Sequence, residues 1–389
     1  MRSRYSALLP PQFVRNADPV TLLYACLPIL ITLRPRLPVA LLAILLILSL
    51  ARNGWGRVSF KQLDRPLVLL SLTFTLLASI SILWSTDPKI SGMEAAKLCG
   101  MLALALLTIC SIQQIQFEPL RRAVTVGSVI GVLSIVLAYA YHDLLPNWLH
   151  SDGPPDTLNR SVVMIVLLCN LILWSSLSND STPFRWSSVI IVYFFCLYLV
   201  MYSRSESAKL AMIVTAISYL LFFARPLLLR YLPLFILLML CSMPIVVWYI
   251  GEGLREYGVW SRLPLTAQQR WNIWLTTLEL WQQAPWLGRG FGVVSNPTPW
   301  FAHPHSLPFE LLLTLGVVGF TIGSFTLAYG VHCLLKVANG PHVGAIVVGV
   351  FSVWMVSHGA WQGWWLAFLV LLTLPMLKRS PKIGEKKGR

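Results

Sequence analysis

Charged residues are scarce in this chain. Asp, Glu, Lys and Arg make up only 12% of the 389 residues, whereas 56% are hydrophobic. Soluble domains carry about 25% charged residues, so the composition excludes a soluble globular enzyme. Disorder is excluded as well, because disordered chains are poor in apolar residues. A transmembrane β-barrel would alternate apolar and polar residues, which leaves a helical protein that crosses a membrane many times.

Motifs for disulfide, metal or nucleotide chemistry are also missing. The seven Cys lie in apolar runs without a CxxC pair, which indicates small core residues. The chain has no DxD motif and no GxSxG motif. No cleavable signal peptide is evident at the N-terminus. We therefore expect neither a metal site nor a cofactor.

Apolar runs that approach the thickness of a hydrocarbon core, about 30 Å, occur twelve times. They cover residues 20–33, 37–51, 66–84, 95–112, 123–141, 161–178, 187–202, 206–223, 231–250, 307–335, 343–357 and 361–377. The run 307–335 is too long for one simple span, and Gly316, Gly319 and Gly323 predict a bend or break in it. The expected fold is all-α, a single membrane-embedded domain over residues 1–389 with about twelve transmembrane helices.

Basic residues predict how this domain is oriented. Nineteen of the 30 Lys and Arg fall on the side of a twelve-span chain that carries both termini, including a basic tail at residues 378–389. The positive-inside rule makes that side cytoplasmic. Arg34 and Arg36 fall on the other side and do not fit the rule.

The one long connection, residues 251–305, lies on the outer side in this topology. Within it, Trp271, Trp274, Leu278 and Trp281 share one face of a helix that Pro285 ends. Tryptophan prefers membrane interfaces. We therefore expect an amphipathic helix at the interface with its rings among lipid headgroups.

Three arginines are candidates for binding an anionic group at the outer face. Arg204 lies in a turn between two spans, Arg270 begins the Trp-rich helix, and Arg289 lies in Gly288-Arg289-Gly290-Phe291-Gly292. A guanidinium offers a fixed fork of donors that suits phosphate. The alternative is that these side chains only anchor the helices at the interface. The glycine run lacks the GxGxxG spacing of a nucleotide loop and predicts a tight turn with close backbone approach.

Two histidines precede the tenth apolar run. His303 and His305 flank Pro304 at the membrane surface, and histidine is the side chain best suited to exchange a proton near neutral pH. The alternative is a pair of ordinary interface histidines. Two histidines alone do not make a metal site, because no outer-loop cysteine accompanies them.

These motifs resemble those of O-antigen ligases and related polymerases. Ser81-Ile82-Leu83-Trp84-Ser85-Thr86-Asp87-Pro88 looks like their S-x-x-W-S-x-D-P signature, and Ser203-Arg204-Ser205 looks like their arginine-bearing turn. The segment from Arg270 to Gly292 is similar to their periplasmic run, and His303-Pro304-His305-Ser306 to their entry into the next span. Ser306 stands where Asn is usual, and Arg289 where a small or apolar residue is usual.

The resemblance implies an inverting glycosyltransferase of the bacterial inner membrane that needs neither metal nor nucleotide. O-antigen ligases transfer a polysaccharide from undecaprenyl pyrophosphate to lipid A–core at the periplasmic face. By motif, Arg204 and Arg270, with Arg289 beside them, would bind the pyrophosphate. His305 would be the catalytic base, and His303 would support it. Residues 251–305 would then be periplasmic, and no nucleic acid would take part.

Two other enzymes share these motifs. An O-antigen or exopolysaccharide polymerase and a protein O-oligosaccharyltransferase differ only in the acceptor. A polysaccharide flippase is the alternative from another class, but it should show charged residues deep within several spans or two similar halves.

Overall fold

The structure is a computed structural model of the chain. It describes residues 19–60, 63–112, 117–140, 158–177, 183–203, 205–256, 262, 265–294, 303–338, 340–357 and 359–376. These residues form helices and turns and contain no strand. The α-helices are α2 (Pro19–Leu33), α3 (Pro38–Asn53), α4 (Arg65–Ile80), α5 (Pro88–Ser111), α6 (Phe117–Ala140), α7 (Leu158–Leu177), α8 (Pro183–Tyr202), α9 (Glu206–Ala224), α10 (Leu228–Glu256), α11 (Leu265–Gln282), α12 (Leu307–Val337), α13 (Pro341–Val356) and α14 (Gly363–Thr373). Short 3₁₀ helices lie at Trp55–Arg57, Ser81–Leu83 and Leu374–Met376.

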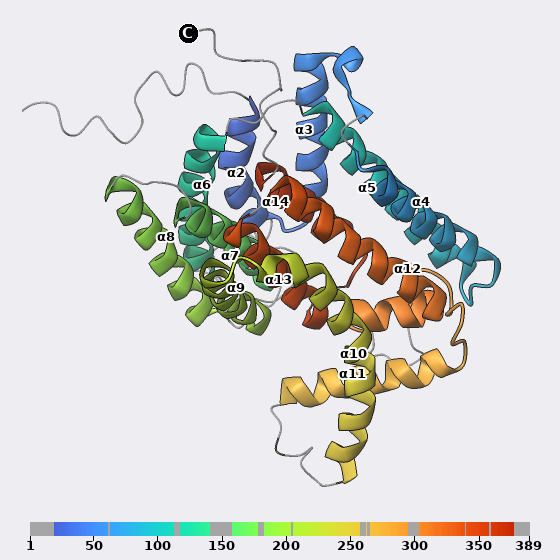
Figure 1. Cartoon of the computed structure of the whole chain (residues 1–389). Helices are drawn as coiled ribbons and strands as arrows, with labels where there is room; N and C mark the ends of the chain where they lie inside the picture. The colour runs from blue at the N-terminus through green and yellow to red at the C-terminus, as the bar shows by residue number, and fades with distance from the viewer. Residues whose placement is uncertain are drawn as a thin grey trace, which may run out of the picture.

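Each of the twelve apolar runs lies on one of these helices, so the all-α prediction is confirmed (Figure 1). Five helical segments are long and apolar enough to cross a membrane: Arg65–Leu83, Pro88–Ser111, Glu206–Ala224, Leu228–Gly251 and Leu307–Val337. Seven further apolar helices are shorter. The chain is therefore a multi-pass membrane protein, and the count of twelve spans stays a prediction.

Capping residues fix where several of these helices begin. The carboxylate of Asp87 accepts a hydrogen bond from the Ile90 amide at 3.0 Å, and the Asp64 carboxylate accepts one from Leu67 at 3.1 Å. Each Asp satisfies an amide that the first turn would leave without a partner. Proline follows within two residues in both α4 and α5, where its missing N–H costs nothing.

The packing of α9 against α13 brings distant loops to one end of the bundle. A Cβ on Gly344 would meet Phe222, and one on Gly349 would meet Thr215. The order of the contacts reverses along the two helices, so they are antiparallel. Their small residues allow this close approach. The start of α9, directly after Arg204, therefore lies at the same end as the C-terminus of α13.

Helix α12 is interrupted, as the glycines predicted. Gly316 has φ 62° and ψ −164°, outside the helical region, whereas Gly319 and Gly323 keep helical geometry. The break therefore lies at one glycine. It leaves the carbonyl groups of Leu313 and Thr314 free to accept hydrogen bonds from residues outside the helix.

The predicted helix in the long connection is present as α11, but its tryptophans do not all face lipid. The Trp274 ring is buried and stacks on Phe309 of α12, with ring centroids 5.6 Å apart. Leu275 and Leu278 are buried beside it against α10 and α12. The expectation that this stripe lies among headgroups is wrong for Trp274, because α12 offers it an apolar partner. Figure 1 shows α11 crossing α10.

Candidate functional site

The two histidines lie together at the start of α12. Their ring centroids are 3.8 Å apart, and the His305 amide donates a hydrogen bond to His303 Nδ1 at 3.3 Å. His305 has φ 53°, in the left-handed region. This conformation is energetically unfavourable for any residue other than glycine. The Trp274 indole donates to the Pro304 carbonyl at 3.0 Å and holds this strained segment against α11.

A backbone carbonyl decides which nitrogen of His305 is free to act. His305 Nδ1 lies 2.7 Å from the Ser357 carbonyl oxygen at the end of α13. A carbonyl only accepts hydrogen bonds, so Nδ1 carries the proton and the lone pair of the neutral ring is on Nε2. This is the arrangement that a histidine base requires.

Burial keeps both rings neutral. It lowers the pKa of His305; the Ser357 hydrogen bond partly offsets this, and the positive charge of Arg270 lowers the pKa again. Burial lowers the pKa of His303 to about 4, with further lowering by His305 and Arg160. An unprotonated His305 can accept a proton at neutral pH.

Two of the predicted arginines present unsatisfied donors. Among the described residues, Arg270 Nη1 and Arg289 Nη1 are buried and have no hydrogen-bond partner. Burial lowers the pKa of Arg270, but a guanidinium remains charged throughout the physiological range. A buried cationic donor without a partner is costly, and an anionic ligand would satisfy it.

Arg160 is a further cation that acts on the histidines, and the sequence did not predict it. Its guanidinium carbon lies 5.6 Å from the centroid of the Trp364 ring. It acts electrostatically on His303, and Arg36 acts on it in turn. The sequence gives only a weak signal, an arginine one residue before an apolar run. Arg36, which does not fit the positive-inside rule, thus lies within the electrostatic reach of Arg160.

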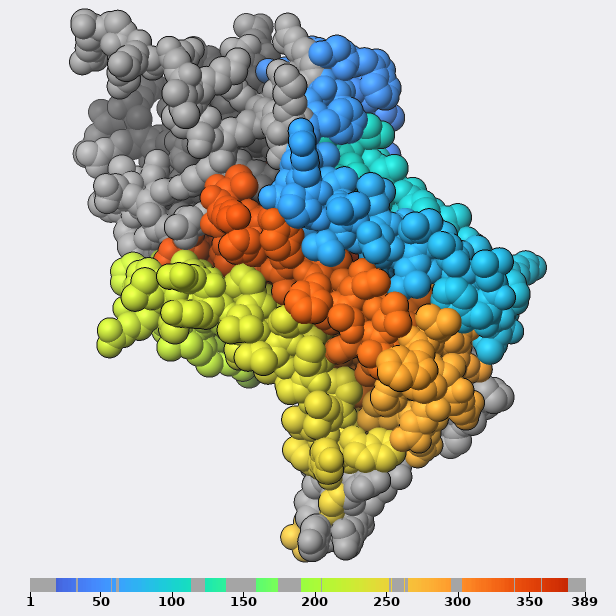
Figure 2. Space-filling model, turned by 45° about the vertical axis from the view of Figure 1, so that its right-hand side comes forward, coloured from blue at the N-terminus to red at the C-terminus, as the bar shows by residue number. Residues whose placement is uncertain are grey.

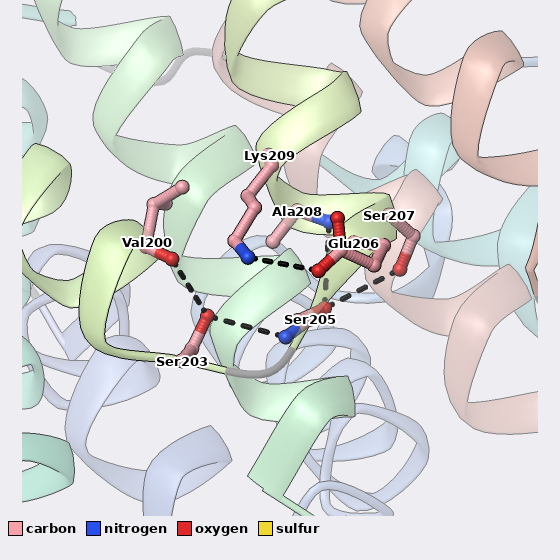
Figure 3. Close-up of polar contacts among 7 residues, drawn as sticks. All are labelled: Val200, Ser203, Ser205, Glu206, Ser207, Ala208 and Lys209. Carbon is pink, nitrogen blue, oxygen red and sulfur yellow. Dashed lines mark hydrogen bonds and ion pairs between the residues drawn. The ribbon is translucent and has the colours of Figure 1, made fainter. Parts of the chain in front are cut away.

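Arg204 lies outside the described residues, and its part in the site stays a prediction. The residues on either side are buried and tied together (Figure 3): Ser203 Oγ donates to the Val200 carbonyl at 3.1 Å and accepts from the Ser205 amide at 3.4 Å. At the start of α9, Lys209 and Glu206 form an ion pair at 2.8 Å. This turn lies at the end of the bundle where α13 presents Ser357 to His305.

The glycine run makes the close backbone approach that its composition predicts. Gly288, Gly290 and Gly292 all have positive φ, between 69° and 107°. The amides of Arg289 and Gly290 donate to the carbonyls of Leu313 and Thr314, 3.0 and 2.9 Å away, beside the break in α12.

On its other side, the glycine run binds the turn between α4 and α5. The Thr86 amide donates to the Arg289 carbonyl at 2.9 Å, and the Trp84 indole donates to the Leu287 carbonyl at 3.0 Å. Figure 2 shows the orange residues of this region beside the cyan residues at the start of α5. Two motifs about two hundred residues apart therefore form one structural unit.

Metal ligands do not cluster in the described part of the chain, where no group of three or more His, Cys, Asp or Glu side chains could hold an ion. The described site residues form a neutral histidine with a defined tautomer, within the electrostatic reach of Arg270 and next to a second histidine on which Arg160 acts. Such a set can deprotonate a hydroxyl next to a bound anion.

The candidate residues lie in a part of the chain that is similar to known proteins. Residues 191–322 match the family model of the O-antigen ligase, a stretch that contains Arg204, Arg270, Arg289, His303 and His305. A protein of Rickettsia bellii (strain RML369-C) that is described as a polysaccharide ligase is 21% identical over 335 residues, covering 79% of each chain. The resemblance found in the sequence motifs is therefore confirmed.

Proposed function

We propose, from the O-antigen ligase domain that this chain carries at residues 191–322, that it is an O-antigen ligase of the bacterial inner membrane. It transfers a polysaccharide from undecaprenyl pyrophosphate to lipid A–core at the periplasmic face. The observation that carries this proposal is the hydrogen bond of His305 Nδ1 to Ser357, which leaves Nε2 as a base near the buried, unpaired donor of Arg270.

The donor's pyrophosphate binds the arginines of the outer face. Arg270 and Arg289 each have a buried Nη1 without a partner among the described residues, and phosphate oxygens are the acceptors that a guanidinium matches best. Arg160 adds positive charge on the His303 side, and Arg204 is the fourth cation by its motif. These charges stabilise the pyrophosphate as it leaves, which is where negative charge develops.

The acceptor hydroxyl loses its proton to Nε2 of His305 as its oxygen attacks the anomeric carbon. The bond from that carbon to the pyrophosphate oxygen breaks on the opposite face of the sugar, so the configuration inverts. Undecaprenyl pyrophosphate departs with the bonding electrons, and His305 becomes an imidazolium that returns its proton to water. General-base help of this kind is worth about 10²–10⁴-fold in rate.

The acceptor separates this proposal from its alternatives. An O-antigen or exopolysaccharide polymerase would pass the glycan to another growing chain, and a protein O-oligosaccharyltransferase would pass it to a protein. Both use the same donor and the same base.

A deletion strain tests the assignment. For a ligase, polymer disappears from lipid A–core and accumulates on the undecaprenyl carrier, and a plasmid copy of the gene restores it. Loss of chain length alone would identify a polymerase. Loss of glycan from proteins, with lipopolysaccharide unchanged, would identify a protein transferase.

A further inference from the structure

A buried glutamate lies one helical turn beyond the histidines without a part in the proposed chemistry. Glu310 is in the first turn of α12 and only 4% exposed. Its Oε2 accepts a hydrogen bond from the Ala360 amide at 2.7 Å, between segments fifty residues apart in the chain. Burying a carboxyl group is costly unless it is hydrogen-bonded, so this contact is a specific one.

The same two segments are joined a second time by the base itself. His305 Nδ1 binds the Ser357 carbonyl at 2.7 Å. His305 stands five residues before Glu310, and Ser357 stands three residues before Ala360. The start of α12 and the turn after α13 are therefore held together at two points, one of which is the base.

The rest of this turn is packed as well, and the Ser357 amide donates a hydrogen bond to the Val353 carbonyl at 2.9 Å. Trp361 lies between Phe74 and Phe291, with ring centroids 5.1 and 5.0 Å away. The backbone of Ser357 is no longer helical, with φ −132° and ψ −64°. Glu310 contacts this turn through the Ala360 amide without using the base, so its hydrogen bond can hold the turn independently of His305.

We propose that Glu310 is a positioning residue, whose hydrogen bond to Ala360 holds the turn so that the Ser357 carbonyl fixes the tautomer and orientation of His305. This inference rests on the proposed function, because it concerns the base of that reaction. As a positioning residue, Glu310 does not touch the substrate. It acts through the backbone of the turn.

Two variants and a control separate this role from a general loss of stability. Glu310→Ala removes the acceptor, and Glu310→Gln keeps an oxygen that can accept from the same amide. Glu279→Ala removes an exposed carboxylate of α11 and serves as the control. Each purified protein is assayed with an undecaprenyl-pyrophosphate-linked oligosaccharide as donor and lipid A–core as acceptor.

We expect Glu310→Ala to lower kcat about 10–100-fold, as small misplacements of a catalytic group do, while KM for the donor changes less than about threefold. Glu310→Gln should keep kcat within about fivefold of the wild type, and the control should equal it. A wild-type kcat in Glu310→Ala, or an equally large loss in Glu310→Gln, would overturn the proposal.

Hydrogen exchange gives a readout that does not depend on transfer. The Ala360 amide should exchange at least about tenfold faster in Glu310→Ala than in the wild type or Glu310→Gln, because it has lost its acceptor. Unchanged exchange would contradict the role of Glu310 alone. A wild-type protein that does not transfer glycan, yet shows this exchange pattern, would contradict the proposed function alone.

Discussion

His305 and His303 are neighbours with different environments, and this difference predicts different phenotypes. Only His305 is held by the Ser357 carbonyl, whereas His303 Nδ1 is used to accept the His305 amide. We therefore expect His305→Ala to abolish transfer while the protein still inserts. His303→Ala should keep part of the activity, since it loosens the segment without removing the base. The measurement is the initial rate at matched expression, and reversed phenotypes would move the base to His303.

The pH dependence of transfer follows from the direction of the His305 pKa. Burial lowers that pKa below its ordinary value of about 6.5, so the base is neutral above this value and becomes protonated only as the pH falls through its lower, folded-state pKa. Transfer should therefore be constant through neutral pH and decline only in acid. A rate that already falls between pH 8 and 7 would contradict this assignment of the base.

Substituting lysine for arginine tests whether geometry or charge matters at the anion site. Lysine keeps the charge of Arg270 but loses the planar fork that binds two phosphate oxygens at once. Arg270→Lys and Arg204→Lys should each lose most of the activity, about 10-fold or more. Arg230→Lys, at the other end of the bundle in the predicted topology, is the control. Near-normal rates for both site variants would make these arginines interface anchors.

Some members of the site could be predicted from single positions, and others could not. Arg270 and His305 stand out because a charged or titratable side chain beside an apolar run is unusual. Ser357 and Ala360 act through backbone groups, which leave no trace in the residue type. Arg160 becomes relevant only because Trp364, far away in the chain, packs next to it and His303 lies within its electrostatic reach.

At the scale of elements, the glycine run gives a prediction about stability. A Cβ on Gly290 would overlap Ser85 Oγ, and Gly290 has φ 107°. Gly290→Ala should therefore destabilise the protein by about 1–3 kcal/mol through overpacking and backbone strain. Gly56→Ala is the control, because nothing lies within 4 Å of its added Cβ. Thermal unfolding in the same detergent checks both, and equal midpoints would show that the run adapts.

Helices were easier to predict than their partners. Periodicity and apolar length gave the position of every apolar helix, and the stripe of Trp271, Trp274 and Leu278 gave α11. The stripe did not reveal that Trp274 stacks on Phe309, because a lipid headgroup and a neighbouring helix both favour an apolar face. Likewise, three glycines predicted a break in α12 without showing which of them breaks the helix. The break is at Gly316, which packs against the glycine run.

On the scale of the whole molecule, groups from several connections act on the two histidines or on Arg160 beside them. Arg36 follows α2, Arg160 begins α7, Arg270 lies in α11 after α10, and Ser357 ends α13. Four apolar helices separate Arg36 from Arg160 in the chain, and four more separate Arg160 from α11. An even number of crossings returns the chain to the same face. Twelve alternating spans would therefore deliver all these connections to one side, as the contacts require.

The positive-inside rule predicts that this side is periplasmic, since nineteen of the 30 basic residues lie on the opposite side with both termini in the predicted topology. An alkaline phosphatase fused at Ser295, in the long connection, should therefore be active, and one fused at Lys382, in the basic tail, should be inactive. Phosphatase folds only in an oxidising compartment, where its disulfides form. Green fluorescent protein at Lys382 is the matched positive control for the cytoplasm. Phosphatase activity at Lys382 and none at Ser295 would invert the topology and place His305 away from the donor that it is proposed to use.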